Sequence, residues 1–496
     1  MAVLGTGSDV GKSVVTTAFC RILADRGLRV APFKAQNMSN NSGVTPEGLE
    51  MGRAQIVQAE AARIVPHVDM NPVLLKPTSD VGAQVVLNGM VLRDASAKSY
   101  HQQKERFFAE SCAALDRLRH RCDVVVMEGA GSCAEVNLMA GDIVNLRMAA
   151  YAGAPVVLVA DIDRGGVFAQ IVGTLACLSP AQQAQISGFI INRFRGDLDL
   201  FKEGADWIVQ KTGKPVFGVL PWFSGFSIEA EDAVVIQKTQ AFRPGPGAGP
   251  AVAVIRLPHI SNFTDFDPLA RIDGLHLVYL EKRQSLAGIQ AVILPGTKST
   301  RSDLEWLHQT GWSDALRRHA AAGGHLLGIC GGYQMLGQTV RDPQGVEALP
   351  GSTPGLDLLP VQTELKAPKT TTLTEFTWDG IPGRGYEIHM GQTDIADGRA
   401  LLRLLRRNGL DCSDRDGCTG GDGRVLGTYL HGLFDTPAIT RRWLEGLGLG
   451  TLPVDAAHGP AVRDKAYDLL AAHTLRHVDM AAIFSLLGGE GKGDSA

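Results

Sequence analysis

Short apolar runs alternate with amphipathic segments through the first half of the chain. The runs lack the apolar–polar alternation of a sheet with one solvated face, so they predict strands buried in a parallel sheet. Between the first two runs, Val15, Phe19 and Ile22 form a helical stripe that ends before Gly27. The strands predicted in this half are Ala2–Leu4, Arg29–Phe33, Val124–Met127, Val156–Ala160, Gly188–Ile191 and Val216–Leu220. This alternation is typical of a doubly wound α/β domain.

A Pro/Gly-rich stretch separates this half from a second α/β pattern. Residues 243–250 read RPGPGAGP, a composition typical of a linker. The strands predicted beyond it are Val252–Leu257, Ala291–Leu294, His325–Ile329 and Arg424–Tyr429. From about Thr440 onward the pattern is helical. We therefore predict α/β domains with mostly parallel sheets at residues 1–240 and 251–440, joined by a linker at 241–250 and followed by a helical extension at 441–496.

The composition is that of a globular protein and narrows its partners. Of the 496 residues, 45% are hydrophobic and 20% charged, which excludes a mainly disordered chain. The 48 basic and 52 acidic residues leave no basic field for nucleic acid. The longest apolar run, Met148–Ala160, is too short to cross a membrane, and no signal peptide is recognised. With eight cysteines and no CxxC pair, we expect a cytoplasmic location; the oligomeric state stays open.

A glycine-rich loop between the first strand and the first helix predicts phosphate binding. Residues 5–13 read GTGSDVGKS, in which Gly7 and Gly11 allow backbone N–H groups to approach phosphate oxygens. Lys12 is expected to reach the β- and γ-phosphates, and Ser13 to bind Mg²⁺. The strict motif has glycine where this chain has Thr6, so the loop is one residue longer when counted from its first glycine. We predict ATP and Mg²⁺ as ligands.

Polar residues at other strand ends extend this predicted nucleotide site. Glu128 ends one strand beside a glycine turn, where it is a candidate Mg²⁺ ligand. Asn192 follows another strand and is a candidate for nucleotide binding, although a plain turn residue is the alternative. Glu50 is a candidate second Mg²⁺ ligand.

Charged residues at the same sheet edge are candidates for substrate binding. Lys34 opens an amide- and hydroxyl-rich stretch after the second strand, where ligands bind in sheets of this type. Its ammonium group suits a substrate carboxylate. Asp161, Asp163 and Arg164 follow the next strand end, with a density of charge that a plain connecting loop does not need.

The second half contains a predicted nucleophile. Cys330 lies between glycines, after a strand and before a helix, where a strained turn exposes a thiol. His431 follows about a hundred residues later, and a remote histidine is the expected partner of a catalytic cysteine. Either residue alone would suit a core position; the elbow and the order of the pair favour catalysis.

This half resembles the class I glutamine amidotransferase domain. The resemblance implies that Cys330 attacks the amide of L-glutamine, that His431 carries protons, and that backbone N–H groups near Thr297 and at Gly331 form the oxyanion hole. The family's usual third member, a Glu two residues after the histidine, is Leu433 here, and Asp435 is no direct substitute. Orientation of His431 must then come from elsewhere, or glutamine hydrolysis is weak until the first domain is loaded.

The first half is similar to dethiobiotin synthetase and its amidoligase relatives, and the two halves together resemble the cobyric acid synthase family. The absence of a lysine before Lys12 argues against the partitioning ATPases. The stretches that carry the resemblance are 34–42, 53–55, 161–168, 191–197 and 385–391. The resemblance implies ATP- and glutamine-dependent amidation of carboxylates b, d, e and g of a corrinoid, adenosylcobyrinic acid a,c-diamide.

Two alternatives stay open. The nearer one is the sister amidoligase, cobyrinate a,c-diamide synthase, whose amidotransferase half is similar. The farther one is a non-enzymatic P-loop switch with a decayed second half, against which the intact Cys330, His431 and Lys12 argue.

Overall fold

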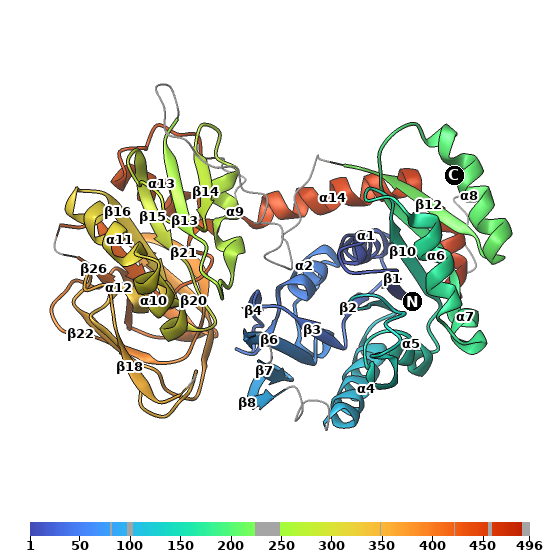
Figure 1. Cartoon of the computed structure of the whole chain (residues 1–496), viewed down its shortest axis with the longest axis horizontal. Helices are drawn as coiled ribbons and strands as arrows, with labels where there is room; N and C mark the ends of the chain where they lie inside the picture. Colours follow the sequence, from blue (N-terminus) through green and yellow to red (C-terminus); the bar gives the residue numbers. More distant parts are fainter. Residues whose placement is uncertain are drawn as a thin grey trace.

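The computed structural model describes residues 1–79, 82–96, 103–223, 249–347, 349–420, 422–454 and 459–488. Two α/β lobes lie side by side, and a long helix near the C-terminus extends from one to the other (Figure 1). The α/β fold class predicted from the apolar runs is confirmed. Most of the predicted linker, residues 241–248, lies outside the described residues.

A six-stranded parallel sheet forms the core of the first lobe, in the order β12-β11-β10-β1-β9-β2. Its strands are β1 (Ala2–Gly5), β2 (Val30–Phe33), β9 (Val124–Glu128), β10 (Val156–Asp161), β11 (Ile186–Phe194) and β12 (Val216–Pro221). All six predicted strands are therefore present. The helices of this lobe are α1 (Lys12–Asp25), α2 (Arg53–Ala61), α4 (Lys104–Arg121), α5 (Leu146–Ala152), α6 (Val167–Ala176), α7 (Pro180–Gln185) and α8 (Leu198–Thr212).

Two small sheets between β2 and α4 were not predicted, and they lie on the side of the first lobe that faces the second (Figure 1). One contains β3 (Gln36–Met38), β6 (Val73–Ser79), β7 (Gly82–Leu87) and β8 (Met90–Ser96); the other is the hairpin of β4 (Ser42–Val44) and β5 (Glu50–Gly52). The hairpin packs tightly on the second lobe, because a Cβ added to Gly48 would lie 2.3 Å from Asn408 Nδ2.

The second lobe has its own largely parallel sheet, in the order β14-β13-β15-β16-β27-β26. Its strands are β13 (Ala251–Ile255), β14 (His276–Leu280), β15 (Ile289–Leu294), β16 (His325–Ile329), β26 (Cys418–Thr419) and β27 (Val425–Thr428). Only the β26–β27 pair is antiparallel. The helices here are α9 (Asp267–Ala270), α10 (Thr300–Gln309), α11 (Trp312–Ala321), α12 (Gly331–Leu336) and α13 (Pro437–Gly446).

A largely antiparallel insertion between α12 and β26 was also not predicted. Its strands are β17 (Thr339–Asp342), β18 (Gly351–Pro354), β19 (Val361–Glu364), β20 (Thr370–Trp378), β21 (Ile381–His389), β22 (Gln392–Ile395), β23 (Leu402–Arg407), β24 (Leu410–Asp411) and β25 (Arg415–Asp416). Tyr386 of β21 exchanges two backbone hydrogen bonds with His431, at 2.9 and 3.1 Å. The insertion therefore brings residues 385–391 against the predicted catalytic histidine.

The predicted C-terminal extension is helical, but it is shared between the lobes. Helix α13 packs on the second lobe, whereas α14 (Pro460–His477) and α15 (Met480–Leu486) cover the first (Figure 1). The Tyr467 hydroxyl of α14 donates to Glu60 of the first lobe at 2.8 Å. Among the described residues, no helix combines the length and apolarity that crossing a bilayer requires.

Candidate active site

Cys330 occupies a strained turn between β16 and α12. Its φ of 54° and ψ of −111° lie outside the ordinary helix and strand regions. The flanking glycines allow this turn: a Cβ on Gly332 would lie 1.9 Å from Leu294 O, and one on Gly328 would lie 2.6 Å from Gly332 O. The Cys330 thiol is buried and lies 3.5 Å from the Ile388 carbonyl oxygen of β21. The predicted strand–elbow–helix is therefore present.

A carboxylate that the sequence did not reveal holds His431. Nδ1 of His431 lies 2.6 Å from Asp265 Oδ2, and Gly432 N donates to Asp265 Oδ1 at 3.0 Å. Asp265 belongs to a short 3₁₀ helix (Phe263–Phe266) that follows β13. Asp265 lies 166 residues from His431 in the sequence, so a motif search near the histidine could not identify it. The one sequence signal for Asp265 was its position shortly after the first strand of the lobe, at the sheet edge where ligands bind in α/β folds.

The environment of His431 suits proton transfer. Burial alone would lower the pKa of His431, but Asp265 and Cys330 together raise it to about 10. In the part of the chain that the structure describes, the buried His431 Nε2 has no hydrogen-bond partner. The Tyr386 ring stacks on the imidazole, with ring centroids 5.2 Å apart. An imidazole oriented by a carboxylate, whose pKa a nearby thiol also influences, is the arrangement that cysteine nucleophiles use.

The two residues predicted to border the oxyanion lie together beside Cys330. A Cβ on Gly331 would lie 3.2 Å from Thr297 N, so the two backbones approach closely. The Thr297 hydroxyl donates to the His259 carbonyl oxygen at 3.1 Å, which fixes the loop after β15. Thr297, Cys330 and Gly331 also line one common pocket.

The glycine-rich loop wraps around the start of α1. Gly11 has a φ of 98°, and a Cβ there would lie 2.0 Å from Asn192 Nδ2, so only glycine suits this position. Asn192 Nδ2 donates to Val10 O at 3.0 Å and thereby supports the loop. Lys12 Nζ donates to the carbonyl oxygens of Gly7 and Gly131 at 2.9 and 2.8 Å. The loop residues predicted to bind nucleotide are therefore adjacent.

Glu128 is the centre of a buried polar cluster next to this loop. Its Oε1 accepts from Ser13 Oγ and from Lys34 Nζ, each at 2.9 Å, and its Oε2 accepts from Gln58 Nε2. Sequence reasoning missed Gln58, which lies on α2. Ser13 and Glu128 offer the hard oxygen donors that Mg²⁺ prefers, and Mg²⁺ usually takes few protein ligands besides phosphates and water. The residues present therefore fit the ion.

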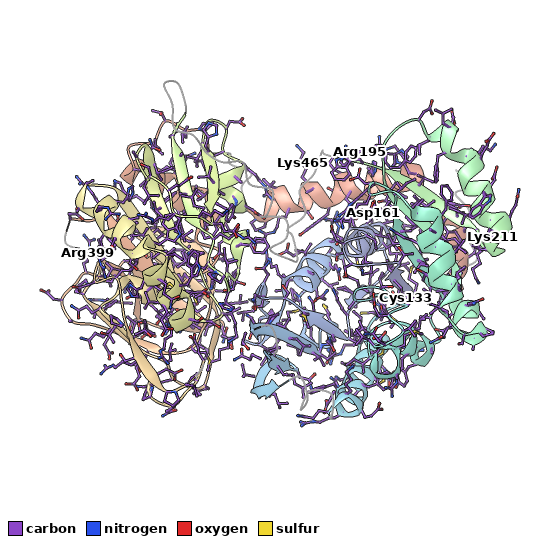
Figure 2. All side chains as sticks on the ribbon, in the orientation of Figure 1. Cys133, Asp161, Arg195, Lys211, Arg399 and Lys465 are labelled. Carbon is purple, nitrogen blue, oxygen red and sulfur yellow. The ribbon has the colours of Figure 1, made fainter. Side chains whose placement is uncertain are left out.

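The charged stretch after β10 borders the phosphate loop. Figure 2 labels Asp161, at the carboxyl end of β10, and Arg195. The ion pairs here are Arg164–Asp9 at 3.0 Å, Arg193–Asp9 at 2.9 Å, Arg193–Asp161 at 2.8 Å and Arg195–Asp163 at 2.7 Å. Because Asp9 belongs to the loop itself, the predicted substrate residues lie beside the nucleotide site.

Glu50 does not take the place expected of a metal ligand. Its Oε1 accepts from Lys76 Nζ and Ser42 Oγ, both at 2.8 Å, and its Oε2 accepts from Lys369 Nζ at 2.6 Å. Burial would raise the pKa of the Glu50 carboxyl, but Lys369 and Lys76 hold it well below its usual range. A carboxylate shared between two ammonium groups is a poor cation ligand. In this structure Glu50 joins the two lobes, and its role as a second Mg²⁺ ligand stays a prediction.

The ammonium groups around Glu50 are crowded. Burial lowers the pKa of Lys369 to about 7; Glu50 opposes this shift, while Lys76 and Lys298 add to it.

Within the described ranges, no group of three or more His, Cys, Asp or Glu side chains is arranged to hold a metal ion.

Comparison with known proteins agrees with this architecture. Residues 1–234 match the CobQ/CobB/MinD/ParA nucleotide binding domain, and residues 251–439 match the CobB/CobQ-like glutamine amidotransferase domain. Fold and site thus define a glutamine amidotransferase fused to a P-loop nucleotide-binding domain.

Relatives that match along the whole chain specify the family to which it belongs. Cobyric acid synthase of Chlorobaculum tepidum is 50% identical over 100% of this chain and 99% of its own length. The cobyric acid synthases of Chlorobium phaeobacteroides and Salmonella typhimurium are 52% and 47% identical over 98% and 97% of this chain, and over 99% and 97% of their own lengths. The chain belongs to the cobyric acid synthase family, whose members are glutamine-hydrolysing carbon–nitrogen ligases.

Proposed function

We propose that this chain amidates carboxylates b, d, e and g of adenosylcobyrinic acid a,c-diamide to give adenosylcobyric acid, using ATP and ammonia from glutamine. The observation that carries the proposal is the presence of two complementary sites in one chain. Cys330, His431 and Asp265 form one, and the phosphate loop with Glu128 forms the other. Relatives with the name cobyric acid synthase match over the full length, which supports the corrinoid as substrate.

The first site supplies the nitrogen. The Cys330 sulfur attacks the amide carbon of glutamine, and the oxyanion lies at the backbone N–H groups of Thr297 and Gly331. His431, held by Asp265, takes the proton from the Cys330 thiol and gives it to the leaving ammonia, and a glutamyl thioester remains. Water then releases glutamate and regenerates the thiol.

The second site activates the acceptor, because a carboxylate is a poor electrophile. The substrate carboxylate oxygen attacks the γ-phosphorus of ATP, which gives an acyl phosphate and ADP. Ammonia then attacks the acyl carbon, and inorganic phosphate leaves. In this proposal Lys12 binds the phosphates, and Lys34, which pairs with Glu128, binds the substrate carboxylate. Mg²⁺ held by Ser13 and Glu128 would supply neutralisation of the phosphate charge.

Two variants test the separation of these roles. Cys330→Ser is expected to abolish glutamine-driven amidation while free ammonia still supports the reaction. Lys12→Ala is expected to fail with both nitrogen sources, with Cys330 still alkylatable. Lys211→Ala, on the exposed surface of α8, is the control. Full use of glutamine by Cys330→Ser, or normal ATP turnover by Lys12→Ala, would contradict the proposal.

The choice of acceptor separates this function from the sister activity. ATP turnover should rise with adenosylcobyrinic acid a,c-diamide, whose a and c positions are already amidated. If ATP turnover rises with cobyrinic acid but not with the a,c-diamide, the chain would be a cobyrinate a,c-diamide synthase instead.

A further inference from the structure

The pocket in front of Cys330 is built from both lobes. Most of its lining comes from the second lobe, including Lys298, Glu347 and Lys369, but Lys76 and Gln84 come from strands β6 and β7 of the first. The second lobe alone therefore leaves this pocket incomplete.

The cations of this pocket have unused hydrogen-bonding capacity. An ammonium group has three N–H donors. Lys76 donates to Glu50 and Ser42, and Lys369 donates to Glu50. These are their hydrogen bonds to the described residues, so donors remain on both. The Lys76 and Lys369 side chains are only 4% and 9% exposed, which keeps water from satisfying all of them.

The charge of this cluster calls for an anion. One carboxylate, Glu50, is shared by two buried amino groups, Lys76 Nζ at 2.8 Å and Lys369 Nζ at 2.6 Å. Buried charges are costly unless they are paired. A ligand that brings a carboxylate to Lys76 and Lys369 would neutralise the excess.

Glutamine has the complementary charges. Its α-carbon bears one carboxylate and one ammonium group, and the pocket also contains one acid, Glu347, whose oxygens accept from Thr300 N at 2.8 Å and Thr300 Oγ1 at 3.1 Å. We propose that Lys76 and Lys369, held in place by Glu50, bind the α-carboxylate of glutamine, so that the first lobe completes the glutamine pocket. This inference rests on the proposed role of Cys330 toward glutamine.

The test compares glutamine with its α-carboxamide, which lacks the negative charge, by ammonia release from the full chain. Because hydrogen bonds to charged groups are strong, the wild type should prefer glutamine by about 10- to 100-fold in kcat/KM. Lys76→Met should lose this preference, mainly through a higher KM for glutamine, while its kcat/KM for the α-carboxamide stays nearly constant. Lys76→Arg keeps the charge and should keep the preference.

A matched control lies on the same loop as Lys369. Lys366 is half-exposed and pairs with Glu364, so Lys366→Met should leave the preference intact. Ammonia-driven amidation reports whether each variant is folded; if Lys76→Met is not, Lys369→Met must show the same loss. A wild-type preference in a folded Lys76→Met or Lys369→Met protein would overturn the inference. If a diazoketone analogue of glutamine fails to alkylate Cys330 in the wild type, the proposed function itself fails, and this inference fails with it.

Discussion

Asp265 is the residue on which the chemistry of the second lobe depends most clearly. Removing its charge by Asp265→Asn should slow ammonia release from glutamine at least about 100-fold, because His431 loses its orienting carboxylate. Since Asp265 also raises the pKa of His431, that pKa should fall from about 10, as measured by NMR titration of labelled histidine. Asp435→Asn is the control, because the Asp435 carboxylate pairs with Arg463 at 3.4 Å. A normal rate in Asp265→Asn would show that His431 is held by other groups.

Leu433, the position where related domains have an acid, is a core residue in this chain. It is fully buried with Leu430, Phe434 and Ile439, so a carboxylate there would not reach water. We expect Leu433→Glu to lower the free energy of unfolding by about 3 kcal/mol or more, whereas Leu433→Met should cost less than about 1.5 kcal/mol.

The loss in Leu433→Glu should depend on pH. Burial raises the pKa of a carboxyl group, so the folded variant retains a proton that the unfolded chain releases above about pH 4.3. Stability relative to the wild type should therefore decrease as pH rises, and urea denaturation should show a larger difference at pH 8 than at pH 5. A faster glutaminase at full stability would contradict this view of the site.

At the scale of elements, the central strands of the two parallel sheets could be predicted, whereas the parallel edge strand β14 and the strands of the small sheets and the insertion were missed. The six strands of the first sheet have continuous apolar runs because helices cover both faces. Strand β20, in contrast, reads TTTLTEFTW with mostly half-buried residues, and a polar strand of this kind resembles a loop in sequence. The glycine-rich loop and the cysteine elbow are local signals, whereas Asp265, Lys76 and Lys369 reach the site only through tertiary packing.

The docking of α14 on α1 depends on a buried arginine. The Arg21 side chain is fully buried and pairs with Asp464 and Asp468 of α14, both half-exposed. Changing both acids to Asn removes the two carboxylates that pair with this buried charge, which should cost about 3–5 kcal/mol by urea denaturation. Arg21→Met should cost less, because its former partners can reach water. The reverse order of stability would show that packing of the Arg21 stem, and not its charge, holds the helix.

At the scale of the whole molecule, the two lobes meet next to the candidate active site. The β4–β5 hairpin carries Ser42 and Glu50 from the first lobe to Asn262 and Lys369 of the second. Ser42 N donates to Asn262 Oδ1 at 3.0 Å, and Asn262 O accepts from the backbone of Asp265 at 3.0 Å. The support of His431 is thus continuous with the nucleotide-binding lobe.

The return of α14 and α15 to the first lobe has a consequence for synthesis on the ribosome. Their residues Tyr467, Ala471 and Ile483 share one apolar cluster with Val15 and Phe19 of α1. Translation at about 5–20 residues per second separates these two parts of the cluster by roughly 20–90 seconds. During that interval the nascent first lobe must keep one apolar face uncovered, so we expect the lobe that is made first to reach its final stability last.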